Sequence, residues 1–130
     1  MKIEEVIRIC VLGGGVTATV KDITSHYFGG YYHVRIQISA DVPVTAASFE
    51  AVTDYENAVV QLGHSVRFSR TLEKMAVPDA EIEAVRQQLL AAFDANVLPY
   101  LLRDDFAPSF VRCEYHKKLK SVPIFSGSHS

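Results

Sequence analysis

The stretch ITSHYFGGYYHVRIQI, residues 23–38, decides the fold of this chain. β-branched and aromatic residues, which favour strands, stand on both sides of Gly29-Gly30. A Gly-Gly pair between two such runs indicates a tight turn, because glycine adopts positive φ angles at little cost. The stretch therefore predicts an antiparallel hairpin in which Phe28 and Tyr31 flank the turn.

The two faces of this hairpin differ in polarity. An uninterrupted ladder from the turn sets His26 opposite His33 and Thr24 opposite Arg35, and successive side chains then alternate between the faces. The apolar face, which we expect to cover the core, carries Ile23, Tyr27, Tyr32, Val34, Ile36 and Ile38. The polar face carries Asp22, Thr24, His26, Phe28, Tyr31, His33, Arg35 and Gln37.

Further strands and helices follow from the periodicity outside the hairpin. Residues 3–12 are rich in Ile and Val and precede a Gly-Gly-Gly turn, so they pair with residues 16–28. Apolar residues then recur at three and four positions over residues 49–62, which predicts a helix that ends at Gly63. Residues 65–72 alternate like a strand. Residues 79–97 carry the clearest helical stripe, and residues 110–116 alternate like a final strand.

The resulting order is three strands, a helix, a strand, a helix and a strand. We therefore predict an α+β fold, an antiparallel sheet of about five strands with two helices packed on one face, because this arrangement covers every apolar stripe. A chain of 130 residues has the usual size of one domain. We assign residues 1–116 to a single domain and residues 117–130, rich in Lys and Ser, to a C-terminal tail that is mobile or docks on a partner.

Composition and charge exclude several classes of protein. The apolar share of 48% and the charged share of 22% are typical of a globular chain. The net charge of −2 gives no overall positive field for nucleic acid or an anionic membrane. No run approaches the ~20 apolar residues of a membrane helix, and the start lacks a secretory leader. We expect a cytoplasmic protein in which Cys10 and Cys113 are reduced thiols.

No motif in the sequence identifies a reaction. The three glycines at residues 13–15 precede a β pattern rather than a helix, so they do not form a phosphate-binding loop. Zinc-ligand spacing and the nucleophile elbow of hydrolases are missing. We therefore predict no cofactor, and the catalytic residues, if the chain has any, stay unknown.

Arginine and histidine side chains recur on the polar face of the predicted sheet. One interpretation is a site for an anion or an acidic small molecule, because a guanidinium offers a planar fork of donors to a carboxylate or phosphate. The other is a solvated face on which Arg pairs across strands with Asp22 and Glu114. The candidate ligand-binding residues are His26, His33, Arg35, Arg67, Arg112 and His116.

Two further features of the polar face bear on metal binding and assembly. His26 and His33, if directly opposed, could share a metal, but a site needs at least three protein ligands, so we predict no metal. The aromatic residues at the turn either pin the register or mark an interface, in which case Phe28, Tyr31 and Phe110 lie at its centre.

The leading hypothesis is a small binding or assembly module. It is expected to be a homodimer whose polar sheet face contacts a second copy, a partner protein or an acidic small molecule. The alternative is a small enzyme that uses His26 or His33 as acid or base, while Arg35 or Arg67 holds an anionic substrate.

Overall fold

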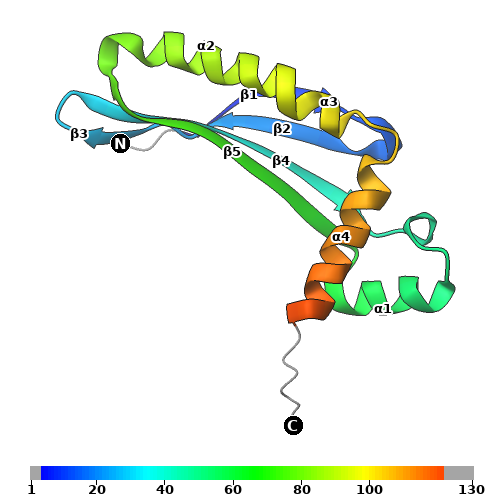
Figure 1. Ribbon diagram of the computed structural model, residues 1–130. Helices are drawn as coiled ribbons and strands as arrows, with labels where there is room; N and C mark the ends of the chain where they lie inside the picture. Colours follow the sequence, from blue (N-terminus) through cyan, green and yellow to red (C-terminus); the bar gives the residue numbers. More distant parts are fainter. Residues whose placement is uncertain (1–3, 122–130) are drawn as a thin grey trace. The chain divides into compact units, whose positions relative to one another are not determined.

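The computed structural model describes residues 4–121, which fall into two compact units (Figure 1). Unit 1 takes the chain up to Asp41 and the segment Arg67–Asp104, and unit 2 takes Val42–Val66 and the chain from Asp105 onward. The α+β class with a five-stranded antiparallel sheet is confirmed. The prediction that residues 1–116 form a single domain stays a prediction.

The sheet has the order β1-β2-β4-β3, and β5 pairs with β4. Antiparallel pairing joins β1 to β2 around the glycine turn η1, Gly13–Gly15, as expected. The end of β5 lies beside the start of β4. The N–H of Asp79, which follows β5, donates to the carbonyl of Gly30, which precedes β4, at 3.2 Å. The strands are β1 (Glu5–Val11), β2 (Thr17–Asp22), β3 (Ser25–Phe28), β4 (Tyr31–Pro43) and β5 (Ser65–Pro78).

Helical segments of unit 1 cover one face of this sheet (Figure 1). Helix α2 (Ile82–Ala92) continues through the π-helical turn η4 (Phe93–Val97) into α3 (Leu98–Leu101). The core between α2 and the sheet includes Val34 of β4, Val77 of β5 and Val85 of α2. No helix within residues 4–121 has both the length and the apolar character that crossing a membrane requires.

The hairpin between β3 and β4 contains a bulge that the sequence pattern does not reveal. Phe28 pairs with Tyr31 as predicted, but His26 pairs with Tyr32, so Tyr27 is an extra residue in β3. Every pairing upstream is therefore shifted by one residue, and Asp22 lies opposite Ile36. Because paired residues point to the same side of a sheet, the bulge places Asp22 on the covered face rather than on the polar face.

Unit 2 is built from two helices and a short turn. The chain enters through the 3-10 turn η2 (Ala46–Ser48) and α1 (Val52–Leu62), and it returns as α4 (Phe106–Ser121). Helices α1 and α4 contact each other, and Asn57 Nδ2 of α1 donates to the Tyr115 hydroxyl of α4 at 2.5 Å. Tyr115 also packs against Phe49, with ring centroids 5.5 Å apart and the rings nearly perpendicular.

The expected final strand over residues 110–116 is wrong, because this segment belongs to α4. Val111 and Tyr115 are buried four residues apart, which is the spacing of one helix face, while Cys113 is exposed. The helix also extends to Ser121, into the segment assigned to the tail. The rest of that segment, residues 122–130, lies outside the described residues.

Gly63, which ends α1 as expected, offers a test of backbone conformation alone. Its φ is 85° and its ψ is −159°, a region that residues with a Cβ rarely adopt, and an added Cβ would meet nothing within 4 Å. We expect Gly63→Ala to lower the free energy of unfolding by about 1–3 kcal/mol in urea denaturation. Gly13→Ala is the matched control, since that position is equally open and has no positive φ. Equal losses for the two variants would contradict this explanation.

Candidate functional site

One side of the sheet in unit 1 has no helix of that unit on it (Figure 1). The register identifies this side, which we call the open face. Ile9 of β1 pairs with Thr19 of β2, and Lys21 of β2 pairs with Gln37 of β4. By the same alternation, the open face also carries Tyr31, His33, Arg35 and Ser39 of β4.

Carboxylates offset much of the positive charge expected on the open face. His33 Nε2 lies 2.7 Å from Glu73 Oε1 on β5. Arg67 Nε lies 3.3 Å from Asp41 Oδ1, with a second contact from the same guanidinium at 3.4 Å. The predicted residues His33 and Arg67 are therefore already paired across strands, which resembles the solvated face of the second interpretation.

Arg35 is the predicted cation on the open face that has no carboxylate partner among residues 4–121. Its backbone N–H donates to the Thr24 hydroxyl at 3.4 Å. Its side-chain Nε is shielded from solvent and makes no hydrogen bond within the described part of the chain. Arg35 is partly buried and therefore only partly accessible to a ligand.

His26 does not lie opposite His33, which corrects the expected pairing. The bulge at Tyr27 places His26 opposite Tyr32, so the two histidines belong to opposite sides of the sheet. The His26 ring lies edge-on to the Tyr32 ring at 5.3 Å, and its Nε2 contacts the Gly29 carbonyl. The two histidines therefore do not face each other as a metal site would need. No three metal-ligating His, Cys, Asp or Glu side chains gather anywhere within residues 4–121.

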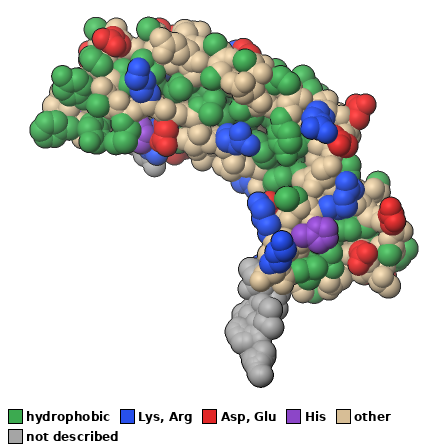
Figure 2. Space-filling view, in the orientation of Figure 1, with side chains coloured by type: hydrophobic (Ala, Val, Ile, Leu, Met, Phe, Trp, Pro, Cys, Tyr) green, Lys and Arg blue, Asp and Glu red, His purple; other side chains and the backbone are tan. Residues whose placement is uncertain are grey.

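Exposed apolar side chains gather on the open face at two places. The first is β1, where Val6, Ile9 and Val11 pair with the open-face residues Lys21, Thr19 and Thr17 and are 49%, 64% and 79% exposed. The second is the hairpin turn, where Phe28 and its partner Tyr31, the residues expected at an interface, are exposed. Figure 2 shows the hydrophobic side chains gathered at the end of unit 1 where β3 and β4 turn.

The two edges of the sheet differ in how well they are protected against pairing. β5 carries Arg, Glu and Lys side chains, ends at Pro78, and is distorted at Ala76, whose φ is 56°. Charges, proline and irregular backbone all discourage another strand from pairing. β1 has neither lysine nor proline, although its pairing with β2 is irregular between Val6 and Arg8. Its Arg8 turns to the covered face, where it pairs with Asp94 and lies 5.7 Å from the centre of the Phe93 ring.

The remaining predicted residues belong to unit 2. Arg112 and His116 stand one turn apart on α4 and line the same pocket, which has a volume of about 600 Å³. Phe110, expected at the centre of an interface on the sheet, is instead half-buried on α4. The pocket is lined by Ala47, Ser48, Phe49, Glu50, Asp54, Arg112, Tyr115, His116 and Leu119.

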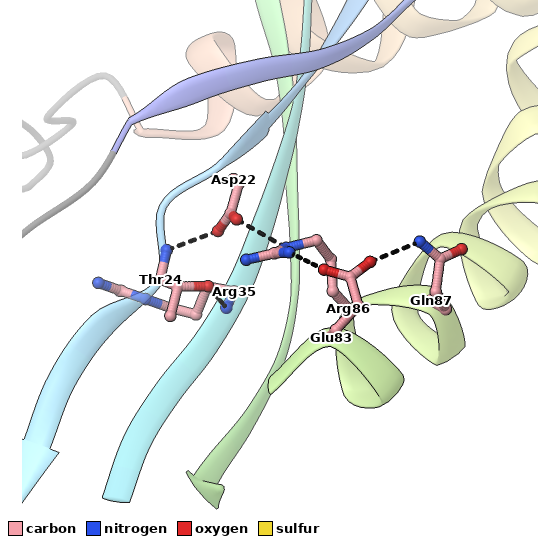
Figure 3. A network of polar contacts seen from close by, with 6 residues as sticks. All are labelled: Asp22, Thr24, Arg35, Glu83, Arg86 and Gln87. Atoms are coloured by element: carbon pink, nitrogen blue, oxygen red, sulfur yellow. Dashed lines mark hydrogen bonds and ion pairs between the residues drawn. The ribbon is translucent and has the colours of Figure 1, made fainter. Parts of the chain in front are cut away.

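A buried polar network that the sequence did not indicate ties α2 to the sheet (Figure 3). Asp22 is almost fully buried; its Oδ1 accepts the Thr24 N–H at 2.9 Å, and its Oδ2 lies 2.7 Å from Arg86 Nε of α2. Arg86 also pairs with Glu83, which accepts a hydrogen bond from Gln87 at 2.9 Å. The local signal was the Asp22-Ile23-Thr24 sequence, since Asp often accepts from the backbone two residues ahead.

Comparison with known proteins returns no match to a family model, a curated protein or a solved structure. The function of this chain therefore has to be argued from its own surfaces.

Proposed function

We propose that this chain is an assembly module that binds a second copy of itself through the open face, with β1 at the centre of the contact. The observation that carries the proposal is the row of exposed apolar side chains, Val6, Ile9 and Val11, on an edge strand. Contiguous exposed apolar surface of this kind often marks an interface.

A second copy fits β1 better than an unrelated partner because the strand is compatible with itself. Its one cation, Arg8, is directed to the covered face and neutralised there by Asp94, so two β1 strands brought together oppose no like charges from this residue. The free backbone edge of each copy supplies the donors and acceptors that the other lacks. A two-fold contact then requires only one surface, used twice.

The rest of the open face supports the contact at its margins. A stable interface buries about 800 Å² on each partner, which is more than three side chains supply. Phe28 and Tyr31 add exposed aromatic surface on the same side of the sheet. The pair Arg67–Asp41 places both signs of charge on this side, so a second copy meets no single-sign field there.

We prefer assembly to the enzyme alternative on the geometry of the same residues. His26 lies on the other side of the sheet from Arg35 and contacts a backbone carbonyl. His33 lies on the same side as Arg35 but contacts Glu73, and Arg67 is engaged by Asp41. An enzyme of the kind considered needs a free histidine within reach of a substrate that an unpaired arginine holds. The contacts of these residues do not provide that combination.

Light scattering on the purified chain tests the proposal. We expect twice the monomer mass at high micromolar concentration, and we expect Val11→Lys or Ile9→Lys to give a monomer, because a lysine at the contact would oppose its own copy. Val60→Lys is the matched control, since Val60 in unit 2 is 78% exposed, close to the 79% of Val11. A monomeric unmodified chain, or a dimer that Val11→Lys and Ile9→Lys both leave intact, would overturn the proposal.

A further inference from the structure

The pocket of unit 2 combines charges of both signs with an apolar wall. Its volume of about 600 Å³ lies in the range of about 300–1,000 Å³ that is usual for small-molecule sites. Its residues come from η2, the segment between η2 and α1, the start of α1 and one face of α4, so all of its walls belong to a single compact unit. The pocket is independent of the open face and of the proposed dimer.

Arg112 is fixed in place by uncharged groups. Its Nη1 donates to the Ser48 carbonyl at 3.0 Å, and its Nη2 lies 3.4 Å from the Ser109 hydroxyl. These two contacts engage only part of the five N–H donors of a guanidinium. These contacts orient the exposed Arg112 side chain, and neither of them neutralises its positive charge with a carboxylate.

Two carboxylates line the same pocket. Glu50 and Asp54 are exposed, and neither forms an ion pair with a described residue. A simple anion would bind Arg112 but meet these two negative charges, and a simple cation would meet Arg112. A ligand that carries both signs would compensate both sides of the pocket.

An apolar wall completes the pocket. Tyr115 is buried, its hydroxyl accepts from Asn57, and its ring packs edge-on to Phe49, so these two rings are held in fixed orientations. Leu119 lies one turn further along α4. This wall offers packing to an apolar side chain between the two charged ends of a ligand.

We propose that this pocket binds a small zwitterion with an apolar side chain, either a free amino acid or a short peptide. Its carboxylate pairs with Arg112, beside His116. Its ammonium group pairs with Glu50 and Asp54. Its side chain packs on Phe49, Tyr115 and Leu119.

Calorimetric titration of the unmodified full chain tests the ligand chemistry directly. The probes are leucine, phenylalanine and the dipeptide Leu-Leu as zwitterions, with N-acetyl-leucine lacking the ammonium and leucine amide lacking the carboxylate. We expect at least one zwitterion to bind, and each singly charged analogue of leucine to bind about tenfold or more weakly than leucine, because a charge-assisted pair is lost. Tighter binding of leucine or of Leu-Leu decides between a free amino acid and a peptide.

Paired variants locate the site. Arg112→Gln should weaken the zwitterion about tenfold or more and remove the preference for a carboxylate, and Asp54→Asn should reduce the preference for an ammonium group. Arg67→Gln and Asp41→Asn change the same residue types in unit 1 and should leave binding unchanged. Should Arg112→Gln fail to fold, the analogue series on the unmodified chain still decides. Failure of every zwitterion to bind at millimolar concentration, or equal binding of leucine and its capped analogues, would overturn the proposal, whatever the oligomeric state.

Discussion

Replacing Asp22 with alanine is expected to lower the free energy of unfolding by about 3 kcal/mol or more. The substitution removes the buried carboxylate beside Arg86 and leaves this side chain, which is 24% exposed, with the exposed Glu83 as its ion-pair partner. It also removes the buried acceptor of the Thr24 N–H. Removing one partner of a buried pair costs more than the pair itself contributes, because a charge remains desolvated. Urea denaturation followed by circular dichroism measures the loss.

Two comparisons separate burial from charge loss in this experiment. Asp41→Ala removes a carboxylate from the same kind of pair, but Arg67 and Asp41 are 61% and 62% exposed, so the expected loss is below about 1 kcal/mol. Adding Arg86→Leu to Asp22→Ala removes the guanidinium that has lost its buried partner, and it should recover part of the stability. Similar losses from Asp22→Ala and Asp41→Ala, or no recovery in the double variant, would show that the network does not stabilise the chain in this way.

Phe93→Ala is expected to cost about 3–5 kcal/mol, because the ring is fully buried in η4 and its removal leaves a cavity in the core of unit 1. The loss includes the contact with the Arg8 guanidinium, 5.7 Å from the ring centre. Denaturant unfolding at low protein concentration measures it without a contribution from assembly.

Phe28→Ala is the matched control for this cavity. The same atoms are removed, but Phe28 is 74% exposed, so the expected loss is below about 1 kcal/mol. Comparable destabilisation by the two variants would mean that the hairpin turn, and not η4, is part of the stabilising core.

The strands and the glycine turns could be predicted because they depend on local chemistry. β-branched runs and the Gly29-Gly30 turn specify a hairpin regardless of what packs on it. The bulge at Tyr27 could not be predicted in this way. A bulge leaves the composition and the alternation of the sequence unchanged, and packing on the two faces of the sheet stabilises it. One unforeseen residue was enough to misplace Asp22 and to pair the wrong residues with His26 and His33.

The site on α4 was missed for a different reason. Val111, Cys113 and Tyr115 alternate with charged residues, which fits a half-buried strand, while Val111 and Tyr115 also fit one face of a helix. Only the partners of this segment, Asn57 and Phe49 among them, decide between the two patterns. Once the segment is a helix, Arg112 and His116 fall one turn apart and line the same pocket as Glu50 and Asp54, which are far away in the sequence.

The sheet and its helices are encoded in two separate pieces of the chain, interrupted by Val42–Val66. The ends of this gap, Asp41 and Arg67, lie side by side on neighbouring antiparallel strands, with Nε and Oδ1 3.3 Å apart. Hairpin loops of about 2–5 residues join strands so placed. A shortened gene that connects Asp41 to Arg67 by such a loop and stops at Asp104 would therefore encode the residues of unit 1 as one continuous segment, without the residues of unit 2.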